Sequence, residues 1–354
     1  MAKAHARKQQ VEPGRIDVHH HIFPAQFMAN QEKRNPKWGP QAPPVMVEGW
    51  TPKLACEALD QAGIATAIVQ MKAAPGVWFG DVTAARDLAR EWNEFAATMT
   101  RDFPGRFGMF AVMPMPDTDS TLREIEYAFD VLHVDGVQIM SHYEFRYPGD
   151  RRFWPVLEEL NRRKAVVFVH PFYLPPSHDI LPGVRPATIE FPFDSTRAIV
   201  SLVLSGATSR FPDTQFIFCH GGGTLPMLAG RIVELTRVVK GRWVGEPEDE
   251  HELARKVPNG IEHELKRLYF EIANAYYPPT FNALHAFAPQ SQILFGTDFP
   301  FLSVADHAEG LRKVATAQAV QAIERANALS LFPKFARKEP LTPPSPRSRN
   351  GERE

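Results

Sequence analysis

Residues 16–24 read IDVHHHIFP, a β-branched run that continues into three consecutive histidines. In an extended strand, residues i and i+2 point to the same side, with their Cα atoms about 7 Å apart. The imidazoles of His19 and His21 can therefore converge on one metal ion, with Zn–N bonds of about 2.0–2.1 Å. His20 points to the opposite side, and we do not expect it to be a ligand.

Seven further apolar runs follow this first strand, which we place at 15–19. They lie at 65–71, 107–113, 136–140, 165–170, 215–220, 268–273 and 292–296. Several are unbroken, such as AVVFVH and QFIFCH, which is typical of parallel strands covered on both faces.

Helical patterns separate these runs, at 81–103, 119–132, 153–162, 194–209, 224–239 and 306–316. Asp119 and Ser120 are the expected caps of the second of these helices. The alternation predicts an α/β protein, a distorted TIM (β/α)8 barrel forming a single domain, with a doubly wound sheet as the competing architecture.

The two ends of the chain differ from its middle. Residues 1–14 are basic and polar, and residues 337–354 (RKEPLTPPSPRSRNGERE) are rich in proline, serine and charge. Such segments bury too little apolar surface to offset chain entropy, so we predict two disordered tails around a domain at 15–336. Within the domain, the charged segment 240–266 is expected to form a solvated helix and loop, with a subunit contact as the alternative.

The overall charge gives no reason to expect a polyanionic partner. Lys and Arg number 40 against 41 Asp and Glu, a net charge of −1, which argues against binding to nucleic acid or an anionic membrane. No apolar run approaches the roughly 18 residues of a membrane span, and we recognise no signal peptide. The two cysteines, Cys56 and Cys219, fit a reducing compartment. We therefore expect a cytoplasmic protein.

Polar side chains that suit metal binding or proton transfer stand at four predicted strand ends. His170 ends the fifth strand, His220 the sixth, and Asp298 follows the eighth, while His19 and His21 end the first. Each alone could be structural, but barrel active sites lie at the C-terminal ends of the strands, so the combination predicts a metal centre. Gly221–Gly223, directly after His220, permit close approach of a ligand or form a tight turn.

Six motifs in order along the chain resemble the amidohydrolase superfamily. They are IDVHHHIFP (16–24), PGVWFGD (75–81), ELNRRKAVVFVHP (159–171), FIFCHGGG (216–223), FGTDFPF (295–301) and NALSLFP (327–333). The resemblance is to the branch of non-hydrolytic decarboxylases that includes aminocarboxymuconate semialdehyde decarboxylase and the hydroxybenzoate decarboxylases. The second and third motifs look closest to 6-methylsalicylate-type members.

The resemblance implies a role for each of these polar residues. His19, His21, His170 and Asp298 match the metal ligands, and His220 matches the catalytic histidine beside the metal. The fourth strand (VDGVQIMSH, 134–142) lacks the lysine that bridges two metals in binuclear relatives, so one divalent ion is implied, Zn²⁺ first and Mn²⁺ as an option. The family is often dimeric, so a homodimer is also expected.

The implied reaction is decarboxylation of a small aromatic, hydroxybenzoate-like or unsaturated carboxylic acid. The substrate carboxylate would chelate the cation, and Asp298 would protonate the carbon that bears it, with His220 orienting or relaying the proton. Trp78, Phe79 and Phe172 could stack on the ring. Tyr143, with Arg146 nearby, could contact a phenol or carboxylate group. Ordinary loop packing is the alternative role for these residues.

Two other classes of function fit the same sequence. In a hydrolase of a lactone, ester or amide, His220 and Asp298 would activate water at the metal, and a hydratase is a further version. A non-catalytic binding barrel would be expected to have lost some of the five polar positions, yet all are filled.

Overall fold

Eight parallel strands form the centre of the computed structural model, which describes residues 14–34, 47–71, 76–172, 181–238 and 250–336. Each strand pairs with the next along the chain. Their bounds are β1 Arg15–Ile22, β2 Ile64–Met71, β3 Phe107–Val112, β4 Gly136–Met140, β5 Val166–His170, β6 Gln215–Phe218, β7 Tyr269–Glu271 and β8 Ile293–Leu294.

Backbone hydrogen bonds join the two edges of this sheet. Val18 N donates to Phe295 O at 3.0 Å, and His21 N donates to Phe299 O at 2.8 Å. The predicted (β/α)8 barrel is therefore confirmed, because a doubly wound sheet would neither pair its strands in chain order nor close on itself.

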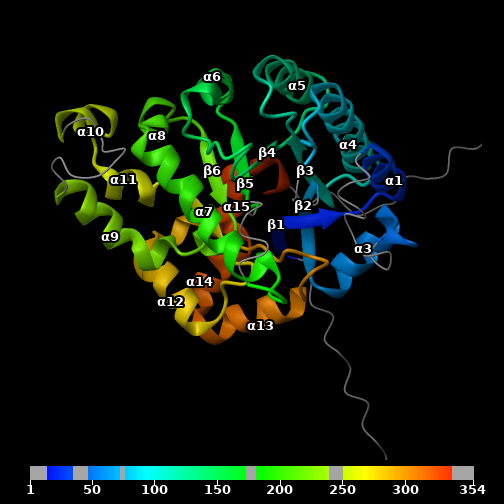
Figure 1. Cartoon of the computed structure of the whole chain (residues 1–354). Coiled ribbons are helices and arrows are strands. Elements are labelled where there is room, and N and C mark those ends of the chain that lie inside the picture. The colour runs from blue at the N-terminus through cyan, green and yellow to red at the C-terminus, as the bar shows by residue number, and fades with distance from the viewer. Residues whose placement is uncertain (1–13, 35–46, 72–75, 173–180, 239–249, 337–354) are drawn as a thin grey trace, which may run out of the picture.

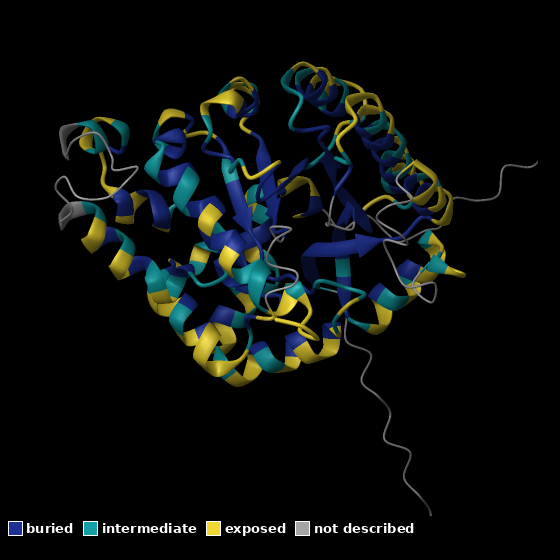
Figure 2. Ribbon diagram, in the orientation of Figure 1, coloured by how far each residue is buried: buried dark blue, intermediate teal, exposed yellow. Residues whose placement is uncertain are grey.

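Helices surround the strands (Figure 1) and turn their exposed residues outward (Figure 2). The α-helices are α1 Ala25–Arg34, α3 Pro52–Gln61, α4 Val82–Asp102, α5 Thr118–Asp130, α6 Trp154–Arg162, α7 Pro186–Leu204, α8 Ala207–Arg210, α9 Leu225–Val238, α10 Glu250–Lys256, α11 Ile261–Lys266, α12 Pro278–Phe287, α13 Val304–Val314, α14 Ala317–Gln321 and α15 Asn327–Leu331. Short 3₁₀ turns lie at Arg151–Phe153, His220–Gly222, Gln290–Gln292 and Pro333–Ala336, and a π turn at Ala322–Ala326.

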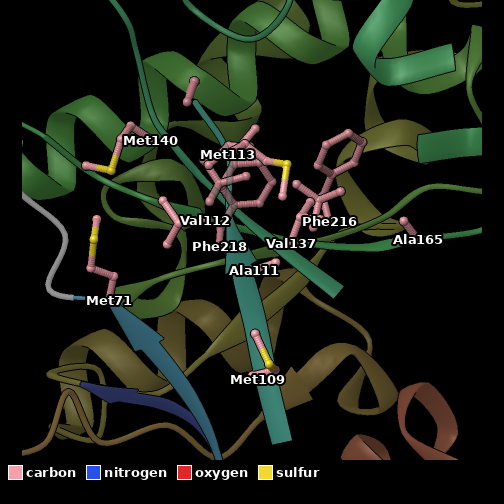
Figure 3. Packing of buried hydrophobic residues seen from close by; sticks show 14 of the residues in the cluster. Met71, Met109, Ala111, Val112, Met113, Val137, Met140, Ala165, Phe216 and Phe218 are labelled. Atoms are coloured by element: carbon pink, nitrogen blue, oxygen red, sulfur yellow. The ribbon is translucent and has the colours of Figure 1, made fainter. Parts of the chain in front are cut away.

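Two apolar clusters hold the barrel together. The smaller cluster includes Ile16, Val18 and Phe168 from the strands, with Phe332 from the chain after α15. The larger cluster joins strand residues to the helices around them, and Figure 3 shows part of it, with the labelled side chains of β3, β4 and β6 close together. The strands are buried almost throughout, as expected where helices cover a parallel sheet.

The observed helix starts correct one prediction about capping. α5 begins at Thr118, and the side chain of Asp117 accepts a hydrogen bond from Ser120 N at 2.8 Å. The expectation that Asp119 and Ser120 cap this helix is wrong, because both already lie in its first turn. The start of α4 agrees with the sequence, since Asp81 accepts from Ala84 N at 2.6 Å.

The charged segment 240–266 is only partly described. Its residues 240–249 lie outside the described residues, as do the predicted tails 1–14 and 337–354 apart from Gly14. α11, at the end of this segment, buries Leu265 completely and Ile261 to 8% exposure. The expectation of a fully solvated helix is therefore wrong for α11, whose apolar face packs inward. In the described part of the chain, no helix is both long and apolar enough to cross a membrane.

Candidate active site

A β-bulge in β1 turns His19 and His21, the two predicted ligands of this strand, toward the barrel interior. Asp17 pairs with Ala67, whereas His20 pairs with Val69, so β1 spans three residues where β2 spans two. Without the extra residue, strict alternation would place His20 on the side already occupied by Ile16. The bulge resets the alternation and lets the strand contribute both apolar interior residues and the two histidines.

His20 faces away from the site, as predicted. Its Nδ1 lies 3.1 Å from an Asp17 carboxylate oxygen, and its ring stacks on Phe299 with centroids 4.7 Å apart. Asp17 also accepts hydrogen bonds from the Thr297 hydroxyl at 2.6 Å and from Thr297 N at 3.1 Å. His20 and Asp17 thus fasten the turn that carries Asp298.

Four predicted ligands meet at one point of the barrel. His19, His21, His170 and Asp298 each offer a donor atom, and these atoms all lie within 4.8 Å of one another. The Nε2 atoms of His19 and His21 are 3.0 Å apart, and Asp298 Oδ1 lies 3.4 Å and 3.0 Å from them, respectively. The three histidines are buried, while the Asp298 side chain keeps 16% of its surface exposed.

The outer nitrogens of the three histidines are all held by acceptors. Nδ1 of His21 lies 3.1 Å from Met71 O, and Nδ1 of His170 lies 2.9 Å from Pro171 O. Nδ1 of His19 lies 3.0 Å from Glu271 Oε1. Since these oxygens can only accept, each Nδ1 carries the proton and each Nε2 presents a lone pair. Three lone pairs and a carboxylate facing one point repel each other unless a cation lies between them, so the donor set fits a divalent metal.

His220 stands beside this cluster rather than in it. Its Nε2 lies 3.5 Å from Asp298 Oδ2, and its backbone N donates to Glu271 Oε1 at 2.7 Å. Both His220 and Asp298 have positive φ, at 55° and 56°, which is uncommon for residues with side chains and concentrates at functional sites. The geometry brings all five predicted polar residues together.

The charges of the site favour the ionised form of its carboxylates. Burial opposes ionisation of Asp298, but His19, His21 and His220, in their protonated forms, hold the pKa of this carboxyl well below its usual range. Burial likewise opposes ionisation of Glu271, and His19 outweighs it, so the Glu271 pKa is also lowered. Burial, with His19 next in effect, holds the pKa of His170 well below its usual value. Burial lowers the pKa of His19, but Glu271 and Asp298 outweigh burial and raise it. Since neutral imidazole and ionised carboxylate are the forms that bind metals, a metal would have to displace a proton from His19.

Glu271, at the end of β7, is a site residue that the sequence analysis missed. It is completely buried, and besides His19 and His220 N its Oε2 accepts from Ala273 N at 2.6 Å. A carboxylate at the end of an apolar strand (LYFEIA) was the available signal. It was overlooked because Glu271 follows a short strand without a recognisable motif around it.

The three glycines after His220 serve close packing. A Cβ at Gly222 would lie 2.7 Å from the Phe270 ring, and one at Gly223 would lie 2.0 Å from Pro192 O of α7. Both have positive φ, 75° and 69°. These contacts account for a tight turn between β6 and α9, one of the two roles expected for this segment.

The three aromatic residues predicted to contact the substrate ring, Phe172, Trp78 and Phe79, each have protein neighbours of a different kind. Phe172 stacks on His142, with centroids 5.4 Å apart and planes 11° apart. Trp78 is partly buried and donates from Nε1 to Glu144 at 3.1 Å. Phe79 packs, half-buried, against the large core cluster.

Tyr143 and Arg146 both have protein partners. Tyr143 is 5% exposed, its hydroxyl accepts from Met140 N at 2.9 Å, and burial raises its pKa. Arg146 lies 3.8 Å from Asp150. Two rings that were not predicted lie close to predicted ligands. Phe191 is 5.9 Å from the His170 ring, and Phe301 is 5.7 Å from that of His21.

Known proteins match this chain along almost its whole length. A family model described as amidohydrolase matches residues 16–334. A decarboxylase of Aspergillus niger is 35% identical over 341 residues, covering 91% of this chain and 88% of the relative. The 6-methylsalicylic acid decarboxylase of Penicillium expansum is 33% identical, covering 91% of this chain and 97% of the relative.

A solved structure shares the fold at lower sequence identity. It is a dihydroxybenzoic acid decarboxylase from a Polaromonas species with bound manganese and the inhibitor 2-nitroresorcinol. The match has a TM-score of 0.74 at 23% identity and covers 92% of this chain and 98% of that one.

Proposed function

We propose a specific activity for this chain, which belongs to the amidohydrolase family. It is a metal-dependent carboxy-lyase that acts on a small hydroxybenzoate-like acid. The observation that carries the proposal is the convergence of four ligand atoms with His220 at their edge. Relatives that match over almost the whole chain are decarboxylases. Two of them, each 33% identical to this chain, are named as 6-methylsalicylic acid decarboxylases. An acid of that kind is the first substrate to test.

His19, His21, His170 and Asp298 would hold one divalent ion. When bound, such an ion would neutralise and orient the substrate carboxylate and an ortho oxygen. Imidazole and carboxylate ligands suit both Zn²⁺ and Mn²⁺. We retain Zn²⁺ as the first expectation, while the Polaromonas structure carries manganese.

Asp298 and His220 would handle the proton. Loss of CO₂ directly from an aromatic ring would leave an electron pair in the ring plane, where the π system cannot stabilise it. A proton added first to the carboxyl-bearing carbon makes that carbon tetrahedral. The C–CO₂ bond then breaks, its electrons restore the aromatic ring, and CO₂ leaves. Overall, one proton replaces the carboxylate.

The lowered pKa of Asp298 adds a requirement to this scheme. An ionised carboxylate must take up a proton before it can deliver one. His220 Nε2, 3.5 Å from Asp298 Oδ2, is placed to pass it on. His220 would therefore relay the proton that Asp298 delivers, and Glu271 would hold His220 in place through its backbone.

Aromatic side chains would bind the ring of the substrate. Phe172 follows ligand His170 by two residues, and we keep it with Trp78 and Phe79 as proposed stacking partners. Tyr143 is the weakest of the sequence-derived proposals, since its hydroxyl already accepts from Met140 N. We also retain a homodimer and a cytoplasmic location as proposals, the first to be measured by light scattering and the second by cell fractionation.

The test compares metal-free protein with protein loaded with Zn²⁺ or Mn²⁺. Each form is incubated with 6-methylsalicylate, 2,6-dihydroxybenzoate and a panel of lactones and esters, and CO₂ and acid release are measured. CO₂ release that needs the metal and is lost in Asp298→Asn supports the proposal. Turnover of a lactone or ester without CO₂ release from any aromatic acid would overturn it in favour of a hydrolase.

A further inference from the structure

A second buried polar network lies beside the metal-ligand cluster. At its centre is Asp194 of α7, which is fully buried. Its carboxylate accepts hydrogen bonds from the Ser141 hydroxyl, from His142 Nδ1 at 3.0 Å and from the Tyr147 hydroxyl at 2.6 Å. Removing a carboxylate from water is costly unless several donors surround it, so three donors on one acid indicate a carefully held arrangement.

This network is joined to the end of β5, which carries ligand His170. Ser141 N donates to His170 O at 2.8 Å, and the Ser141 hydroxyl accepts from Phe172 N at 2.8 Å. Met140 pairs with His170 in the sheet. His142, two residues after Met140, stacks on Phe172, two residues after His170. The strand ends therefore place the His142 ring next to the segment that follows the metal ligand.

α7 contacts both histidines from the same side. Phe191 meets the His170 ring edge-on at 5.9 Å, and Asp194, three residues later, binds His142. Residues three apart on a helix lie side by side, about 5–6 Å apart at Cβ. His142 and His170 thus both contact one short stretch of α7.

The hydrogen bond to Asp194 decides what His142 can offer a ligand. A carboxylate only accepts, so Nδ1 of His142 carries a proton, and in the neutral ring Nε2 is a pure acceptor. No described residue forms a hydrogen bond with Nε2, although the side chain is 4% exposed. A ring nitrogen that can only accept, and that has no partner among the described residues, is suited to a hydroxyl donor and unsuited to another carboxylate.

We propose that His142, held by Asp194, is a recognition residue for a phenolic hydroxyl on the ring of the aromatic acid, separate from the oxygens that the metal would bind. The inference rests on the proposed function for its substrate class. The same network also ties the loop after β4 to α7. The hydrogen bonds of Ser141 and Tyr147 to Asp194 already make this connection. Holding the loop in place therefore does not require Nε2 of His142.

Two substitutions separate recognition from anchoring. In His142→Asn, the amide nitrogen can replace Nδ1 as a donor to Asp194, but nothing replaces Nε2. In His142→Gln, the longer amide can place an acceptor near the position of Nε2. Tyr147→Phe serves as the matched control, because it removes a different donor to Asp194 and leaves the imidazole intact.

The experiment measures binding to the full-length, metal-loaded protein by calorimetry, with 2-hydroxybenzoate and its 4-, 5- and 6-hydroxy derivatives as probes. We expect the wild type to bind at least one dihydroxybenzoate about tenfold more tightly than 2-hydroxybenzoate. His142→Asn should abolish that preference, His142→Gln should restore part of it, and Tyr147→Phe should keep it. Metal content and melting temperature of each variant identify any misfolding.

Two results would overturn the inference. One is a wild type that does not distinguish any dihydroxybenzoate from 2-hydroxybenzoate. The other is an equal loss of affinity for every probe in His142→Asn, which would make His142 a packing residue only. The titrations are kept short enough that the same samples release no measurable CO₂, so affinity is measured apart from turnover. Absence of CO₂ release in long incubations would then count against the proposed function and not against this recognition site.

Discussion

Glu271 Oε1 lies 3.0 Å from Nδ1 of His19, so a fully buried carboxylate fixes the ring that presents its other nitrogen to the metal-ligand cluster. The same oxygen accepts from His220 N at 2.7 Å. The proposed metal ligand His19 and the proposed proton-transfer residue His220 therefore share one support. Carboxylates that orient a histidine ligand also raise its basicity, and they affect metal affinity nearly as much as the ligands do.

Glu271→Gln should weaken metal binding by about 10- to 100-fold. Three N–H groups donate to the Glu271 carboxylate, from His19, His220 and Ala273. The NH₂ group of a glutamine would face one of these donors, such as Ala273 N, and could not accept its hydrogen bond. Competition against a chelator of known affinity measures the effect. Glu124→Gln is the control, because Glu124 is equally buried but binds Arg90 and Asn93 away from the cluster. Unchanged metal affinity in Glu271→Gln would contradict the assigned role.

Adjacent histidines of β1 should respond differently to removal. His21→Ala should lose the bound metal, because Nε2 of His21 lies 3.0 Å from both His19 Nε2 and Asp298 Oδ1. His20→Ala should retain the metal and lose stability instead, since His20 bonds to Asp17 and stacks on Phe299. Elemental analysis and thermal melting of the two variants check this. Retention of metal by His21→Ala at wild-type affinity would refute the ligand set.

Gly223→Ala should destabilise the protein by about 2 kcal/mol or more. Its Cβ would lie 2.0 Å from Pro192 O, and its φ of +69° disfavours any side chain. Gly230→Ala is the matched control, because Gly230 lies exposed in α9 with nothing within 4 Å of a new Cβ, and there alanine should stabilise by up to about 1 kcal/mol. Denaturant unfolding compares the two. Equal stability of both variants would show that the turn tolerates a side chain.

The cap of α5 should contribute a pH-dependent part of stability. Hydrogen bonds from the side chain and backbone of Ser120 lower the pKa of Asp117. A carboxyl with a lowered folded pKa stabilises above its ordinary pKa of about 4 and loses that contribution as pH falls through the folded value.

Asp117→Ala should therefore cost about 1 kcal/mol at pH 7, and the difference from wild type should shrink as pH drops below about 4. Asp117→Asn keeps a capping oxygen that does not ionise. The stability difference between Asp117→Asn and Asp117→Ala should therefore stay constant with pH. Unfolding midpoints in denaturant, from pH 7 down to the lowest pH at which the wild type stays folded, measure both. A deficit in Asp117→Ala that stays constant over this range would exclude an ionised cap.

Much of the fold could be predicted because its signals are local. Most of the eight strands are short apolar runs, and strand-end residues such as His170 and Asp298 have their positions set by chain order in a closed barrel. Alternation of side chains made the pairing of His19 with His21 visible. The ends of helices were less certain, and Asp117 was missed because several possible caps stand close together.

Tertiary structure alone decided how the ligands are aimed and supported. The extra residue of β1 depends on pairing with β2, and without that register the sequence cannot show why Ile16 and His21 both reach the interior. The contacts of Glu271 with His19 and of Asp194 with His142 join residues separated by 252 and 52 positions. Hydrogen-bond partners so far apart leave no periodic pattern, because only the closed barrel and the helix packed over its mouth bring them within reach.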